Sequence, residues 1–150
     1  MLGGKPTDEM TRNAFQPYLK PGETLQHTAY GIKQPNILLI AGLMLLAILP
    51  GVIAVYALMK HYRVGLTDKR LIILQTKDMK SLQVKEMRDF DLGDLKRMDV
   101  KTSIGPIFTN LRIADAEKPF FAKFHRAYSK SNRSESKGIV DGISGARAFT

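Results

Sequence analysis

The sequence of 150 residues contains no cysteine. Disulfides, thiolate metal sites and cysteine nucleophiles are therefore excluded, while the redox compartment stays undetermined. Histidine is scarce as well: His27, His61 and His125 have no spacing that suits a metal ion, so we expect them on the surface or in strands. The glycine-rich phosphate loop, the Gly-x-Ser-x-Gly elbow and the His-Glu-x-x-His motif are all absent from the sequence.

Three closely spaced aspartates, Asp89, Asp91 and Asp94, superficially suggest a calcium loop. An EF-hand needs glycine at its sixth position and glutamate at its twelfth, where this chain has Asp94 and Val100. We therefore expect these aspartates in a solvated turn. Because the sequence shows no paired nucleophile and base either, it predicts a protein that is not an enzyme, with no metal site and no cofactor.

Charged side chains are missing from one long stretch, residues 37–59, which is almost entirely apolar. At about 1.5 Å of rise per residue, a helix of this length would reach roughly 35 Å, enough to cross a hydrocarbon core of about 30 Å. A chain of this size has little other apolar material with which to cover such a helix on every side. The stretch is therefore predicted to be a membrane segment.

Pro50 and Gly51 lie near the middle of this stretch, where proline removes a backbone donor and clashes with the preceding turn. Two structures remain open: a kinked transmembrane helix, or a re-entrant hairpin made of residues 37–49 and 52–59. Each half is too short to cross a bilayer by itself. The length of the stretch favours the kinked span.

Basic residues exceed acidic ones, giving a formal net charge of +9, and most of this excess lies from Lys60 onward. Because Lys and Arg near membrane segments tend to stay in the cytoplasm, the C-terminal part is predicted to face the cytoplasm. The basic residues just beyond the apolar stretch are candidates for contact with anionic phospholipid head groups. They are Lys60, Arg63, Lys69 and Arg70, and the alternative is that their charges only set topology and solubility.

Short segments rich in β-branched and aromatic residues follow the apolar stretch, separated by turn residues, which is typical of an all-β domain. The first two alternate around a turn at Asp68 and are predicted to form a hairpin. One further strand is predicted before the apolar stretch, and it could join the others only from the same side of a membrane, which favours the re-entrant hairpin. The predicted strands are residues 23–32, 62–66, 71–74, 82–87, 95–101, 107–113 and 119–125.

The last part of the chain is predicted to be a helix, at about residues 132–149. Asn132 and Glu135 have the spacing of a capping box before an apolar stripe at helical intervals. Gly138 and Gly142 lie one turn apart and would give the helix a narrow face. We expect that face to pack on the sheet, with contact to a partner as the alternative.

Two motifs resemble the bacterial pleckstrin-homology-like (PH-like) families: Pro21-Gly22-Glu23 before the first strand, and residues 62–72 (YRVGLTDKRLI) across the hairpin. The resemblance implies a mainly β protein, a partly open seven-strand barrel plugged at one end by the C-terminal helix. Two features depart from it: an apolar membrane helix or re-entrant hairpin interrupts the barrel after its first strand, and the tryptophan familiar in the eukaryotic closing helix is missing. The implied division is an N-terminal segment (1–22), a first strand (23–36), the membrane segment (37–59) and the remaining β domain (60–150).

The fold that this resemblance implies is a scaffold for binding lipids, peptides or its own copies rather than for a reaction. The sequence therefore predicts a non-catalytic, membrane-anchored binding or assembly module at the cytoplasmic membrane surface, whose partners are membrane lipids, a protein or a second copy. A basic nucleic-acid-binding membrane protein is the alternative. It would use Phe120, Phe121 and Phe124, which lie near Lys118, Lys123 and Arg126.

Overall fold

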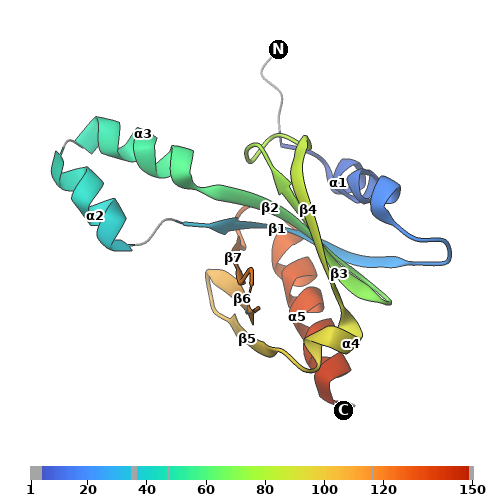
Figure 1. Cartoon of the computed structure of the whole chain (residues 1–150). Coiled ribbons are helices and arrows are strands. Elements are labelled where there is room, and N and C mark those ends of the chain that lie inside the picture. Colours follow the sequence, from blue (N-terminus) through green and yellow to red (C-terminus); the bar gives the residue numbers. More distant parts are fainter. Residues whose placement is uncertain (1–4, 35–36, 47, 116, 149–150) are drawn as a thin grey trace.

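A computed structural model describes residues 5–34, 37–46, 48–115 and 117–148. Its seven antiparallel strands form one strongly curved sheet in the order β4-β3-β2-β1-β7-β6-β5, as Figure 1 shows. The strands are β1 (Leu25–Lys33), β2 (Lys60–Thr67), β3 (Arg70–Thr76), β4 (Val84–Asp91), β5 (Asp99–Ile104), β6 (Phe108–Ala114) and β7 (Phe120–His125). The helices are α1 (Asp8–Phe15), the 3-10 turn η1 (Gln16–Tyr18), α2 (Ile37–Leu46), α3 (Ile48–Leu58), α4 (Leu92–Leu95) and α5 (Asn132–Ala148).

Two antiparallel meanders, β1–β4 and β5–β7, make up the sheet, and they join where Ile32 of β1 lies opposite Lys123 of β7. Helix α5 closes the opening between them. This strand order and closing helix confirm the predicted mainly β architecture, a partly open seven-strand barrel closed by a C-terminal helix. One strand is corrected: residues 95–101 were expected to be extended throughout, but α4 ends at Leu95 and β5 begins only at Asp99.

The core lies inside the barrel and follows the alternation expected of half-buried strands. In β7, Phe120, Ala122 and Phe124 are buried, while the residues between them are partly exposed. Ile139 and Ile143 of α5 complete the same cluster from the open side. Burying a large apolar side chain contributes about 1.5–3 kcal/mol, so these positions stabilise the closed barrel.

The expected capping box of α5 is wrong, because its two residues bind strand β1 instead. Oδ1 of Asn132 accepts the backbone N–H of Tyr30 at 2.8 Å, and Oε2 of Glu135 accepts that of Thr28 at 2.8 Å. A strand edge beside a helix needs such partners because its buried N–H groups would otherwise stay unpaired. The two side chains therefore complete the barrel at the place where α5 lies along β1.

The narrow face of α5 packs on the sheet, as predicted. A Cβ atom added at Gly138 would lie 2.5 Å from Cε1 of His27, and one added at Gly142 would collide with Leu66. The two glycines therefore let the helix approach β1 and β2 more closely than any other residue would allow. Their cost in helix propensity is offset by this contact.

The apolar stretch forms two helices, α2 and α3, that pack against each other and extend away from the barrel (Figure 1). Of the helices in the described ranges, none is both long enough and apolar enough to cross a membrane. In place of one kinked helix, the described residues form two helices that contact each other. Pro50 lies in the first turn of α3, where a missing N–H costs little, instead of kinking one long helix. Gly51 faces α2, since an added Cβ would lie 2.7 Å from the carbonyl oxygen of Leu43.

The chain leaves the barrel and returns to it at the same place. Lys33, the last residue of β1, lies opposite Lys60, the first residue of β2, in an antiparallel ladder that continues to Leu25. The strand predicted upstream of the apolar stretch therefore belongs to the same sheet as the others. We call the α2–α3 pair the apolar finger, and the place where it joins β1 and β2 the foot of the finger.

Candidate functional site

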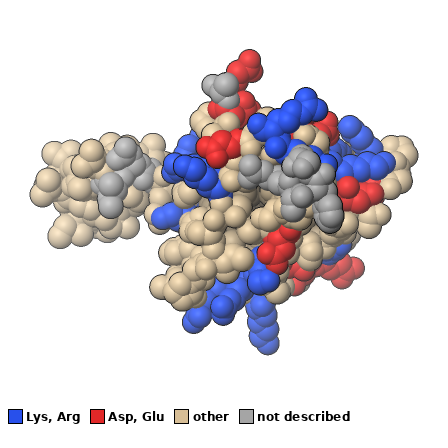
Figure 2. Space-filling model, turned by 90° about the horizontal axis from the view of Figure 1, so that it is seen from below, with Lys and Arg blue, Asp and Glu red and all other residues tan. Residues whose placement is uncertain are grey.

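The apolar finger carries most of the large apolar side chains that the described part of the chain exposes. Leu45 is 87% exposed and Ile48 is 76% exposed. In Figure 2 the finger is a tan projection, and Lys and Arg side chains gather where it meets the barrel. Contiguous apolar surface of this kind marks a membrane or protein contact. The exposed members are Leu38, Leu39, Leu45, Leu46, Ile48, Leu49, Val52, Ile53, Tyr56 and Leu58.

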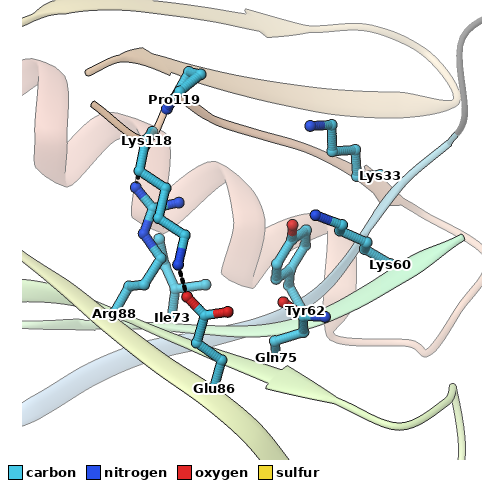
Figure 3. A pocket seen from close by; sticks show the side chains of 9 residues that line it. All are labelled: Lys33, Lys60, Tyr62, Ile73, Gln75, Glu86, Arg88, Lys118 and Pro119. Carbon is cyan, nitrogen blue, oxygen red and sulfur yellow. Dashed lines mark hydrogen bonds and ion pairs between the residues drawn. The ribbon is translucent and has the colours of Figure 1, made fainter. Parts of the chain in front are cut away.

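A basic pocket of about 70 Å³ lies at the foot of the finger. Figure 3 shows Lys33 and Lys60 on one side of it and Arg88 and Lys118 on the other. Lys118 forms an ion pair with Glu86, whereas no acidic side chain of the described residues pairs with Lys33 or Lys60. The two lysines therefore present free positive charge where the apolar surface begins.

An aromatic cluster around Arg63 lies next to the foot, formed by the buried residues Tyr30, His61 and Arg63 and the half-buried Tyr128. The guanidinium of Arg63 lies 4.5 Å from the ring centre of Tyr30 and 5.2 Å from that of Tyr128. It also donates hydrogen bonds of 2.5 Å to the hydroxyl of Tyr128 and to the carbonyl oxygen of Met79. Arg63 is 1% exposed, so aromatic faces and neutral oxygens, rather than a carboxylate, hold its charge.

Burial favours the neutral forms of Tyr30 and His61. The hydroxyl of Tyr30 lies 2.5 Å from Nδ1 of His61. Desolvation raises the pKa of Tyr30 and lowers the pKa of His61, because each charged form would lose its hydration. Near pH 7 the pair is therefore an uncharged tyrosine–histidine hydrogen bond beside a permanent arginine cation.

An apolar pocket of about 330 Å³ opens between this cluster and the finger. Tyr56 from α3 and Met59 just beyond it form the side toward the finger, and Ile32 and His61 form the side toward the barrel. The pocket is lined by Lys5, Tyr30, Ile32, Tyr56, Met59, His61, Met79, Lys123, His125, Ala127 and Tyr128.

The four predicted lipid-facing residues are not brought together. Lys60 is exposed at the foot, and Lys69 is exposed in the turn at the far end of β2. Arg63 and Arg70 are 1% and 3% exposed, so their side chains belong to the interior. The eight residues of β2 separate the two lysines by roughly 26 Å at about 3.3 Å per residue. Contact of these residues with lipid stays a prediction.

Arg70 is part of a buried ion-pair network that we call the clamp. Its guanidinium binds both carboxylate oxygens of Glu23 at 2.9 Å, and Asp89 accepts a further bond of 2.7 Å. Thr67 donates to Glu23 at 2.8 Å. The hydrogen bond from Arg70 lowers the pKa of Glu23 to about 2. Asp89, expected in a solvated turn, lies in β4 and accepts its hydrogen bond from the side chain of Arg70 instead.

Sequence reasoning missed several residues at the foot. Lys33 could have been found, because it is the last basic residue before the apolar stretch, as Lys60 is the first one after it. Lys118 was considered only for the nucleic-acid alternative. The aromatic cluster gave no local signal, because Tyr30, His61 and Tyr128 come from three separate segments. Only the folded sheet brings them together.

The nucleic-acid alternative is not favoured by the aromatic residues on which it depended. Phe120 and Phe124 are each 1% exposed and fill the barrel core. Phe121 is half-buried, with the guanidinium of Arg112 5.1 Å from its ring centre. Stacking on bases requires open aromatic faces, which the two buried rings do not offer.

Neither the family models nor the curated proteins include a match to this chain. Among solved structures, the hSac2 domain from the human phosphoinositide phosphatase Sac2 matches with 11% identity and a TM-score of 0.49, covering 97% of this chain and 86% of that one. A pleckstrin homology domain from Shewanella amazonensis SB2B matches with 13% identity and a TM-score of 0.41, covering 95% and 99%.

Proposed function

We propose that this chain is a non-catalytic binding module anchored at a membrane surface, with the apolar finger inserted in one leaflet and the PH-like barrel outside it. The observation that carries this proposal is the exposed apolar finger with a basic foot. Large exposed apolar patches on a folded domain mark contact sites for a partner or a membrane. An anionic membrane suits this surface best, because its acyl chains would bury the apolar side chains and its head groups would attract the basic residues around them.

The length of the finger suits insertion into a single leaflet. Helix α3 has 11 residues, which at about 1.5 Å each gives roughly 16 Å. One leaflet supplies about half of a hydrocarbon core of about 30 Å. The finger would therefore reach the middle of the bilayer and return, with the barrel staying on the side from which it entered.

The foot would then lie at the level of the head groups. Each Lys or Arg near an anionic membrane surface contributes about 1 kcal/mol of attraction. Lys33 and Lys60 are at this level, whereas Lys69 would lie well away from the lipid. We place the barrel on the cytoplasmic side, because basic residues next to a membrane segment favour that side.

The test uses the absence of cysteine, which allows single labelling sites in the full chain. An environment-sensitive dye is attached at Ile48→Cys, in the finger, and in a second variant at Lys69→Cys, in the turn at the far end of β2. On anionic vesicles the dye at position 48 should shift its emission to the blue and be quenched by lipids brominated on their acyl chains. The dye at position 69 should show neither change.

Two results would overturn the proposal. A dye at position 48 that stays in water on vesicles would mean that the finger does not enter lipid. A dye at position 48 that is already shielded without vesicles, in a chain that sediments as an oligomer, would mean that a second copy covers the finger.

A further inference from the structure

We propose that the apolar pocket at the foot of the finger binds one acyl chain that carries an anionic head, such as a fatty acid. Its volume of about 330 Å³ lies at the lower end of the range of about 300–1,000 Å³ that small-molecule sites occupy. The site is separate from the basic pocket. We expect the pocket to hold the acyl chain of the ligand, in addition to the contacts that its head group makes.

The lining of the pocket suits an apolar chain. Ile32, Met59, Met79 and Ala127 supply aliphatic and thioether surface, and the rings of Tyr30, Tyr56 and Tyr128 supply aromatic surface. Methionine side chains adapt to flexible apolar ligands because they are unbranched and polarisable. The buried polar groups beside the pocket already have partners, since the hydroxyl of Tyr30 is paired with His61 and that of Tyr128 accepts from Arg63. An acyl chain would therefore leave these groups satisfied.

The charge around the pocket selects an anionic head. Lys5 and Lys123 line it, and none of the described residues that line it is acidic. Asp78 is the acidic residue whose charge acts on Tyr30 and His61. Its carboxylate accepts two backbone N–H bonds of 2.8 Å, from Lys80 and Ser81, and is turned to its own loop.

A cationic head such as a quaternary ammonium group would be the alternative occupant of a pocket with three tyrosines. Two of the three rings already hold a cation: Arg63 lies against Tyr30 and Tyr128, and the ammonium of Lys5 lies 5.0 Å from the ring centre of Tyr128. A further cation would meet these charges at short range. The geometry therefore favours an anion.

This proposal does not require that the finger enters a membrane. The test measures the binding of dodecanoate to the full protein chain in buffer without vesicles. The dodecanoate concentration is kept below the one at which micelles form. The chain is labelled with ¹³C at its methionine methyl groups. Met59 and Met79 report on the pocket, whereas Met44 reports on the finger and Met10 on α1.

We expect dodecanoate to shift the methyl signals of Met59 and Met79 in a saturable way and to leave those of Met44 and Met10 in place. Dodecyltrimethylammonium, which has the same chain and a cationic head, should bind at least about tenfold more weakly, and Lys123→Gln should weaken dodecanoate binding by about tenfold. Ala127→Phe should fill the pocket and abolish binding. Its matched control, Ala114→Phe at the end of β6, should bind normally.

Three results would overturn the inference: shifts at Met44 without shifts at Met79, equal affinity for the cationic amphiphile, or unchanged binding by a folded Ala127→Phe variant. The first would mean that the finger alone attracts the amphiphile. Because no vesicle is present, these results are independent of whether the dye at position 48 enters lipid.

Discussion

At one end of the β1–β2 ladder Arg70 is buried between Glu23 and Asp89, whereas at the other end Lys33 and Lys60 extend beside the apolar finger with no acidic partner among the described residues. In the sequence, the residues at both ends of this ladder look alike, because both sets are basic. A buried guanidinium must be paired because its desolvation cost is high, while a solvated ammonium needs no partner and stays available to an external anion. The difference separates a structural end of the barrel from a candidate binding end.

The structural end should show the largest effect. Glu23→Gln removes the carboxylate that binds Arg70 in two places and leaves a buried cation whose remaining charged partner is Asp89. We expect a loss of about 3–5 kcal/mol in the free energy of unfolding, measured by urea denaturation of the full chain. The exposed residue Glu117 offers a control, and Glu117→Gln should change the stability by less than about 0.5 kcal/mol. Equal stability of the two variants would mean that the clamp does not hold this end together.

The same carboxylate predicts an acid-sensitive stability. Arg70 lowers the pKa of Glu23 from its ordinary value of 4.5 to about 2, so folding favours the ionised form. The resulting stabilisation, about 3 kcal/mol, is complete above pH 5 and is lost as the pH falls from about 4.5 toward 2. Urea titrations at several pH values should show this loss in the native chain and a smaller one in Glu23→Gln. Parallel pH profiles would contradict the assignment.

The binding end should respond in affinity rather than in stability. Lys33→Gln combined with Lys60→Gln should weaken sedimentation with anionic vesicles by about 2 kcal/mol, or roughly 30-fold, and should leave the unfolding midpoint unchanged. Lys20→Gln combined with Lys69→Gln removes the same charge from exposed sites near the clamp and should have little effect. Similar losses in both double variants would mean that net charge matters and the position of the foot does not.

Much of this comparison could be predicted from the sequence, because local patterns specify the strands, the turn at Asp68 and the closing helix. The motifs Pro21-Gly22-Glu23 and Thr67-Asp68-Lys69-Arg70 are far apart in the chain but meet in the clamp. Burial could not be predicted in the same way. Arg63 and Arg70 have the same charge as Lys60 and Lys69 in the sequence, and only their long-range partners show that they are interior residues.

The apolar stretch was misjudged for a related reason. The length and hydropathy of the stretch predict helical structure. They contain no information on whether the strands before and after the stretch pair in one sheet. The pairing of Lys33 with Lys60 settles that geometry, and it depends on the whole β1–β2 ladder. Pro50 near the middle of the stretch leaves a kinked helix and a hairpin both open, and the strand predicted upstream is the sign that favours the hairpin.

The smallest expected effect on stability concerns the closing helix α5. This helix contacts β1, the strand that runs between the two ends of the ladder. Asn132 is 3% exposed and binds both backbone groups of Tyr30, so Asn132→Ala should leave a buried N–H unpaired and cost about 1–3 kcal/mol. Ser144→Ala, on the exposed side of α5, should cost less than about 0.5 kcal/mol. Since Tyr30 also lines the apolar pocket, Asn132→Ala should increase amide hydrogen exchange at Thr28 and Tyr30 and leave exchange around Arg70 unchanged. A uniform increase along β1 would instead mean that the helix stabilises the barrel only through its apolar contacts.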